Sequence, residues 1–147
     1  MKFKTSAQQI CYDKIEPWVA DICKDQYIPP SNLPIFIVPV GSATAMIEVL
    51  PWGETESVIS AWSYVVTGAD ITPELMRFLL EQNFDLQFGA FSLDKDGDIR
   101  FQASLVGSSC DKNELETSVN AVLKVADDYD DRIIETWGGK RASDRLA

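Results

Sequence analysis

Carboxylates are the side chains of this sequence best able to do chemistry. Its 147 residues include 23 Asp and Glu, 13 Lys and Arg and no histidine, for a formal net charge of −10. Without histidine, Ser-His-Asp and Cys-His catalysis are excluded and the commonest metal ligand is missing. Paired carboxylates can still carry acid–base chemistry, for instance Glu48 with Asp85 or Asp98. Because 23 acids supply many chance pairs, this enzyme hypothesis stays the alternative.

One acidic segment has the spacing of a calcium loop. Asp94, Asp96 and Asp98 fit positions 1, 3 and 5 of an EF-hand. Gly97 then falls at position 4 instead of 6, and Leu105 stands where the bidentate Glu is required. We therefore expect a hairpin turn at this segment and no bound metal.

A second acidic cluster lies near the carboxyl end of the sequence. Its members are Asp127, Asp128, Asp130 and Asp131. Like charges three and four residues apart on a helix repel one another, at a cost of a few tenths of a kcal/mol for each pair. The cluster is either a solvated acidic face or an acidic docking patch for a basic partner protein.

The cysteines and glycines give no sign of a cofactor. Cys11, Cys23 and Cys110 are odd in number and form no CxxC motif. If Cys11 and Cys23 share a helix, they lie about 18 Å apart, too far for a disulfide. Reduced thiols are typical of the cytoplasm. With no Gly-rich phosphate loop either, we expect no metal and no organic cofactor.

The net charge and the apolar runs limit the partners. A charge of −10 repels phosphate groups, so nucleic acid and anionic membranes are excluded as partners. No run approaches the roughly 18 apolar residues of a membrane helix. We expect a cytoplasmic protein whose partner is another protein.

Hydrophobic periodicity predicts the elements that position these residues. Helical spacing recurs from about 5 to 25, from 72 to 82 and from 111 to 137, and Pro17 predicts a kink or break in the first helix. Strands are predicted at 34–40, 44–50, 57–67, 88–93 and 98–105. Short links between the strands favour an antiparallel sheet.

The predicted fold is α+β, in the order α-β-β-β-α-β-β-α, with five antiparallel strands and helices mainly on one face. Residues 1–139 would form a single domain, and residues 140–147 a mobile basic tail.

The strand predicted at 57–67 is apolar on both faces. The members on one face are Val58, Trp62, Tyr64 and Val66, and those on the other are Ile59, Ala61 and Val65. A sheet covered on one side only alternates apolar with polar residues, so the second face must be covered by a helix of the same chain, a second subunit or a client peptide.

Aromatic side chains favour the client. The predicted partner-binding residues are Trp52, Val58, Trp62, Tyr64 and Val66, in an apolar groove of the sheet. If Trp62 proves to be buried under helices, the opposite face becomes the candidate. Met76 and Leu80, on a helix that is apolar around much of its circumference, are predicted to contact a second copy or a partner.

Residues 72–131 carry a resemblance to a known family. They contain Thr72-Pro73-Glu74-Leu75, Asn83-Phe84-Asp85, Phe88-Gly89-Ala90-Phe91, Asp96-Gly97-Asp98, Phe101-Gln102-Ala103-Ser104-Leu105 and the acidic 127–131 segment. With the element order, these resemble the type III secretion chaperones and the related YbjN family, closest to a cyanobacterial and plastid branch.

The resemblance implies a non-enzymatic protein that holds a client segment or assists assembly, often as a homodimer. It brings no catalytic residue, and the identity of the client stays open. The alternatives to a binding chaperone are the acid–base enzyme and a regulatory dimer module.

Overall fold

The chain folds into one antiparallel sheet with helices on one side. The computed structural model describes residues 2–28, 32–41 and 43–142. The helices are α1 (Ser6–Ile22), α2 (Pro73–Asp85) and α3 (Lys112–Trp137). The strands are β1 (Ile35–Val40), β2 (Ala43–Trp52), β3 (Glu56–Thr67), β4 (Ala90–Leu93), β5 (Ile99–Val106) and β6 (Lys140–Arg141). The predicted α+β class is therefore confirmed, and the predicted element order is found from α1 to α3.

Each helix begins directly after the residue whose side chain caps it. Thr5 accepts a hydrogen bond from the backbone amide of Gln8, and Thr72 does the same for Leu75. Asp111 accepts from the amide of Glu114 in the third cap. These caps satisfy amide groups that would otherwise lack a partner in the first turn.

The break predicted at Pro17 does not occur. Helix α1 is continuous from Ser6 to Ile22 with Pro17 inside it. Proline removes one backbone donor, but Ile15 and Val19 on either side are fully buried against the sheet. Their packing keeps the two halves in one helix.

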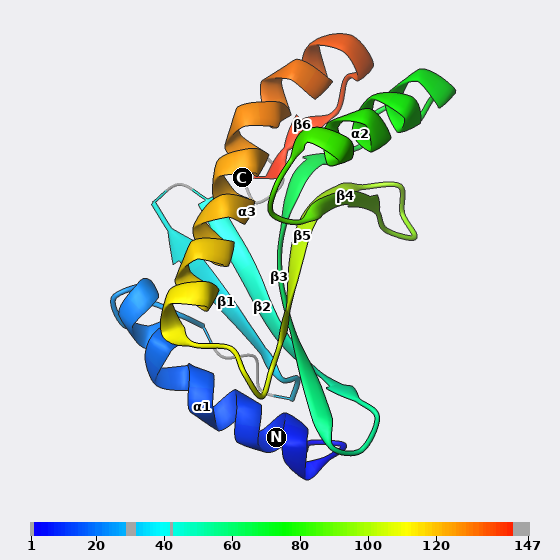
Figure 1. The fold of residues 1–147 in the computed structure, drawn as a ribbon. Helices are drawn as coiled ribbons and strands as arrows, with labels where there is room; N and C mark the ends of the chain where they lie inside the picture. Colours follow the sequence, from blue (N-terminus) through cyan, green and yellow to red (C-terminus); the bar gives the residue numbers. More distant parts are fainter. Residues whose placement is uncertain (1, 29–31, 42, 143–147) are drawn as a thin grey trace.

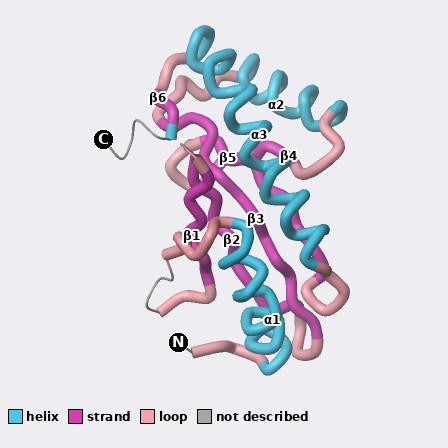
Figure 2. Tube along the Cα trace, turned by 90° about the vertical axis from the view of Figure 1, so that its left-hand side faces the viewer, coloured by secondary structure: helices cyan, strands magenta, loops and turns pink. Residues whose placement is uncertain are grey.

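The strands lie in the order β1-β2-β3-β5-β4, and every pairing is antiparallel. Helices α1 and α3 lie on the same side of the strands (Figures 1 and 2), and α2 packs beside β4 with Phe78 against Tyr129 of α3. The prediction of helices mainly on one face is confirmed.

The sheet has a sixth strand that the sequence did not predict. After Gly138 and Gly139 the chain returns to the sheet, and Lys140 and Arg141 pair with Thr67 and Val66 at the end of β3. Both residues fall in the segment expected to be a mobile tail, so that expectation was wrong for them. Residues 143–147 of that tail lie outside the described residues.

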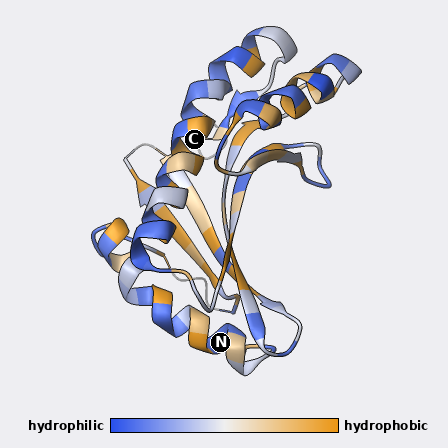
Figure 3. Ribbon diagram, viewed as in Figure 1, coloured by the Kyte–Doolittle hydropathy of each residue, from blue (hydrophilic) through white to orange (hydrophobic). Residues whose placement is uncertain are grey.

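The core lies between the sheet and the helices. Apolar residues run along the strands and alternate with polar ones along the helices (Figure 3). Phe36 of β1 stacks on Tyr12 of α1 with ring centroids 4.4 Å apart, and Phe101 of β5 meets Phe91 of β4 edge-on at 5.0 Å. Among the described residues, no helix is long and apolar enough to cross a membrane.

Candidate functional site

The face of the sheet opposite α1 and α3 carries apolar side chains in register. Met46 of β2 stands between Ile37 of β1 and Trp62 of β3. Val58 of β3 stands between Leu50 of β2 and Val106 of β5. With Trp52 at the end of β2, they form what we call the outer apolar surface. Its members are Ile37, Met46, Leu50, Trp52, Val58, Trp62 and Val106.

The structure places most of the predicted partner-binding residues on this face. Val58, Trp62 and Tyr64 are half-buried, and Trp52 is 69% exposed. Trp52 is the last residue of β2 and not a turn residue, so the alternation of the strand directs it to the same face as Leu50.

Val66 does not lie with them. The register between β3 and β5 shifts between Tyr64 and Val66, which marks a β-bulge or a similar irregularity. One extra residue reverses the alternation of a strand, so Val66 turns toward the helices and is fully buried. The prediction that Val66 shares the face of Trp62 was therefore wrong.

The opposite face of β3 belongs to the core. Ile59, Ala61 and Val65 are at most 1% exposed, beneath the helices. They are therefore closed to a partner, and the fallback site on that face is not needed. Helices of the same chain cover one of the two apolar faces of β3, and the outer face remains.

Several residues of this face were missed from the sequence. Met46, Leu50 and Val106 come from two other strands, and only the cross-strand register brings them beside Trp62 and Val58. The alternation of the predicted strands contained part of this signal, because it separated Met46 and Leu50 from Ile47 and Val49.

An arginine lies on the aromatic part of the face. The guanidinium carbon of Arg100 stands 3.4 Å from the centroid of the Trp62 ring, in a cation–π contact. Trp62 meets Tyr64 edge-on at 5.4 Å, and the Tyr64 hydroxyl donates to Oδ2 of Asp94 at 3.1 Å. The aromatic rings are thus held in fixed positions by neighbours on β5 and on the turn after β4.

A second apolar surface runs along α2. Met76, Leu80 and Phe84 are spaced four residues apart and are 41%, 69% and 91% exposed. Leu75 and Leu79 fill the core on the other side of the helix. Met76 and Leu80 are thus exposed and available for contact, and Phe84 extends the stripe by another turn. We call these three residues the α2 stripe.

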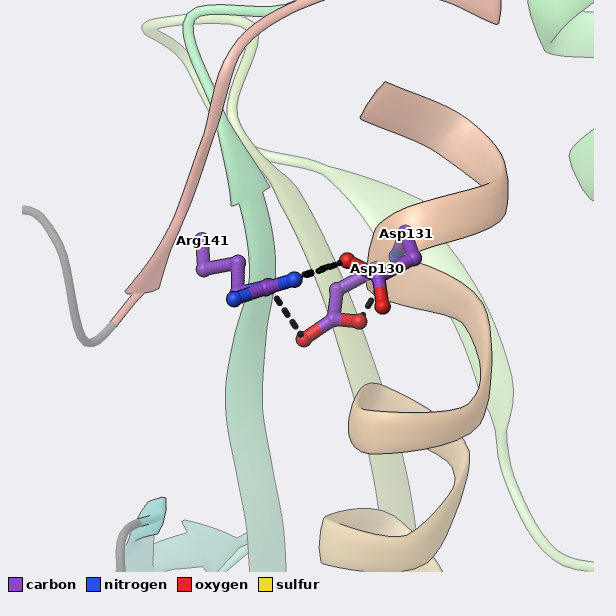
Figure 4. A network of polar contacts seen from close by, with 3 residues as sticks. All are labelled: Asp130, Asp131 and Arg141. Carbon is purple, nitrogen blue, oxygen red and sulfur yellow. Dashed lines mark hydrogen bonds and ion pairs between the residues drawn. The ribbon is translucent and has the colours of Figure 1, made fainter. Parts of the chain in front are cut away.

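The acidic cluster already has cations of the same chain beside it. Arg141 of β6 forms ion pairs with Asp131 and, at 3.7 Å, with Asp130 (Figure 4). Lys124 pairs with Asp128 at 2.7 Å. These pairs reduce the negative charge that the cluster can offer to a basic partner.

The acidic cluster also borders a hollow beside β3. An open pocket of about 820 Å³ separates the start of β2 from α3 and β6. Asp127, Asp130 and Asp131 are among the residues that line it, together with Met46 and Tyr64. Lys140 and Arg141 continue the edge of β3 beyond the hollow, since β2 pairs with β3 only as far as Trp62.

The pKa values of two carboxyl groups, those of Asp130 and Asp94, are shifted in opposite directions. Burial raises the pKa of Asp130, whose side chain is 15% exposed, and the neighbouring Asp131 and Asp127 raise it further against the effect of Arg141. The backbone amide of Asp98, the Tyr64 hydroxyl and the amide of Asp96 lower the pKa of Asp94. Carboxyl carbon NMR titration will place the pKa of Asp130 above the usual range of an aspartate and the pKa of Asp94 below it.

The same shifts set the sign of the pH dependence. Asp94 contributes stability above its unfolded pKa of about 3.9, and that contribution is lost as pH falls through its folded pKa. Asp130 acts in the opposite sense, because its raised pKa gives a contribution that is lost as pH rises through the folded value. Equal pKa values for the two groups would contradict the burial of Asp130.

The calcium-like segment is built as a turn. Oδ1 of Asp94 accepts the amides of Asp96 and Asp98 at 2.9 and 3.0 Å, and Oδ1 of Asp98 accepts the amide of Gly68 at 3.0 Å. Carboxylate oxygens of Asp94, Asp96 and Asp98 lie within 4.8 Å of one another. Hydrogen bonds to the backbone explain this clustering, as expected for the predicted turn.

The structure does not bring Glu48 and Asp98, one of the two pairs of the enzyme hypothesis, together. Glu48 lies opposite Ser60, and Ser60 lies opposite Ser104 of β5. Asp98 precedes Ser104 by six residues, which separates it from Glu48 by roughly 20 Å along the strand. The cysteines are also unsuited to chemistry, because all three are buried and free and burial raises the pKa of Cys110 to about 11.

Comparison with protein families gives one match. The family model described as "T3SS (YopN, CesT) and YbjN peptide-binding chaperone 1" matches residues 35–145 of this chain. The comparison with curated protein sequences returned no match.

Several solved structures share the fold, among them the following three. A chain of the ExsC–ExsE complex aligns with a TM-score of 0.60 and 14% identity, over 83% of this chain and 95% of that one. A chain of the ExoU–SpcU complex, from the type III secretion system of Pseudomonas aeruginosa, gives 0.55 and 15%, over 84% and 97%. A chain of the complex of the Yersinia pestis type III secretion chaperone SycH with a fragment of YscM2 gives 0.54 and 18%, over 80% and 98%. At these identities the likeness concerns the fold alone.

Proposed function

This chain belongs to the family of T3SS and YbjN peptide-binding chaperones, and on that basis we propose that it holds a segment of a client protein against the outer apolar surface. The family is one of peptide-binding proteins and not of enzymes. The complexes of ExsC with ExsE and of SycH with a YscM2 fragment support a protein client.

One observation carries the choice of surface. Helices α1 and α3 cover one face of the sheet (Figure 2). On the other face, the outer apolar surface has members on β1, β2, β3 and β5, in two rows with Glu48, Ser60 and Ser104 between them. Soluble proteins rarely keep a broad apolar patch without a use for it. Trp62 and Trp52 supply the large aromatic side chains that dominate the energy of protein contacts.

Peptide binding tests the proposal directly. We expect short peptides selected by the protein from a random display library to bind through this surface. Replacing Trp62 with alanine should weaken their binding by about 2 kcal/mol, or roughly 30-fold, as is typical of an aromatic anchor. Fluorescence anisotropy measures the dissociation constants, and circular dichroism verifies the fold.

Two further variants avoid the stacked aromatic cluster. Leu50→Glu and Val106→Glu place a charge on exposed positions of the outer apolar surface and should also abolish binding. Ile10→Glu is the matched control, because Ile10 is 67% exposed but lies on α1. If the peptides bind the Leu50→Glu, Val106→Glu and Trp62→Ala variants as tightly as they bind the wild-type protein, the client does not bind at the outer apolar surface.

The charge of the chain bears on the choice of client. A net charge of −10 speeds the encounter with a basic protein. We therefore propose a client of net positive charge. The buried, unbridged cysteines agree with a reducing compartment such as the cytoplasm.

The α2 stripe supports self-association. Met76, Leu80 and Phe84 present a continuous apolar strip on one side of a single helix. A two-fold contact between two such helices buries both strips at once, and this symmetry is the commonest among oligomers. We propose a homodimer that forms through α2, apart from the client surface.

A further inference from the structure

Arg100 stands apart from the other basic residues, on the outer face of the sheet. The register places it between Tyr64 of β3 and Ser92 of β4. Among the residues of β1 to β5 that the register assigns to this face, it is the only lysine or arginine. A cation at this position in a chain of net charge −10 would be expected to pair with one of the many carboxylates.

That pairing is absent from the described part of the chain. Arg100 forms no ion pair there, and its Nε is buried without a hydrogen-bond partner. The nearby carboxylate of Asp94 is already engaged, by Tyr64 through Oδ2 and by two backbone amides through Oδ1. A buried donor without an acceptor costs stability, and a client cannot reach this one, so a client contact falls to the terminal N–H groups of Arg100.

The stacking on Trp62 fixes which part of the guanidinium is available. The guanidinium carbon lies 3.4 Å from the centroid of the indole ring, which is close enough only for a flat stacking, and such stacking leaves the N–H groups at the edge of the guanidinium for other partners. Two adjacent N–H groups of arginine match the two oxygens of a carboxylate, and the bidentate pair is among the strongest polar contacts in proteins. Trp62 therefore holds Arg100 beside the apolar residues of the outer face.

We propose that Arg100 binds an aspartate or glutamate side chain of the client segment, which lies over Trp62 and presents apolar residues to Met46 and Val58. The inference rests on the proposed function and adds the chemistry of the client to it. One cation suits a singly charged carboxylate, whereas a phosphate group requires more positive charge than this acidic chain offers. A client of net positive charge would therefore carry one acidic residue within its bound segment.

A double-mutant cycle tests the contact. Peptides selected by the protein from the random display library are expected to share an Asp or Glu flanked by apolar residues. Replacing that acid with Gln or Asn should weaken binding to the original protein about tenfold, the range of a charge-assisted pair. The same peptide change should have no effect on binding to Arg100→Gln. Arg100→Lys keeps the positive charge but lacks the two adjacent N–H groups of arginine. Its affinity for the acidic peptide should therefore lie between those of Arg100→Gln and the wild-type protein.

Arg132→Gln is the matched control, because Arg132 also stacks on aromatic rings, at 4.7 Å from Tyr129 and 5.4 Å from Phe78, but on α3. It should leave the preference for an acid unchanged. Peptides that depend on Leu50 and Val106 but show no acidic preference would overturn the Arg100 inference and leave the proposed function intact. Peptides whose affinity does not change in any variant of the outer apolar surface would overturn both the proposed function and the Arg100 inference. Should Arg100→Gln fail to fold by circular dichroism, the comparison with Arg100→Lys decides the case.

Discussion

Replacing Gly89 with alanine is expected to lower the free energy of unfolding by about 3 kcal/mol or more, since two separate costs add. Gly89 has a φ of +78°, which side chains of L-residues rarely adopt. An added Cβ would also lie 2.3 Å from the carbonyl oxygen of Gln102 and 2.9 Å from the Phe101 ring. The backbone of β5 cannot move aside without breaking its pairing with β4.

The Gly53→Ala variant distinguishes the cost of the positive φ from the cost of the steric clash. The φ of Gly53 is +64°, but nothing lies within 4 Å of an added Cβ. Gly53→Ala should therefore cost only the conformational part, about 1 kcal/mol. Urea denaturation of the two variants measures both values. Equal losses would mean that the close approach at Gly89 does not restrict the chain.

The position of Gly89 explains why this cost matters for the fold. The chain leaves α2 and turns back so that Ala90 pairs with Gln102. Oδ1 of Asn83, in the last turns of α2, accepts the amide of Phe91 at 2.7 Å. A larger residue at 89 would disturb both contacts, and with them the orientation of the α2 stripe.

The local signals of the sequence predicted the elements correctly. The helical and strand periodicity and the Asp94–Asp98 turn act within single segments, so their effects do not depend on the rest of the fold. The apolar alternation of residues 57–67 also identified Val58 and Trp62 as a pair on one face. These features are those that a single segment decides alone.

Contacts between distant segments were not predictable in the same way. Val66 changed faces because β3 departs from regular pairing with β5, and one sequence contains no sign of that shift. Strand β6 has only two residues and follows two glycines, so it has no periodicity to detect. The stacking of Arg100 on Trp62 requires the register of two strands that lie far apart in the sequence.

Leu80→Glu is expected to convert a dimer into a monomer of 16.4 kDa. In the proposed two-fold contact, the new carboxylate would face its symmetry copy within an apolar strip. Burying an unpaired charge costs about 3–5 kcal/mol, which raises the dissociation constant of the dimer by at least 100-fold. Light scattering at micromolar concentration measures the mass, and circular dichroism should show an intact fold because Leu80 is 69% exposed.

Ile10→Glu makes the same chemical change at nearly the same exposure, on α1, and should leave the dimer unaffected. Phe84→Glu, at the most exposed position of the stripe, should act as Leu80→Glu does. A wild-type protein that already scatters as a 16.4 kDa monomer would exclude the α2 contact.

Because the α2 stripe and the outer apolar surface lie on different elements, the monomeric Leu80→Glu variant should still bind selected peptides with unchanged affinity for each copy. Loss of peptide binding on dissociation would instead show that the client spans both copies, and the client surface would then have to include residues of α2.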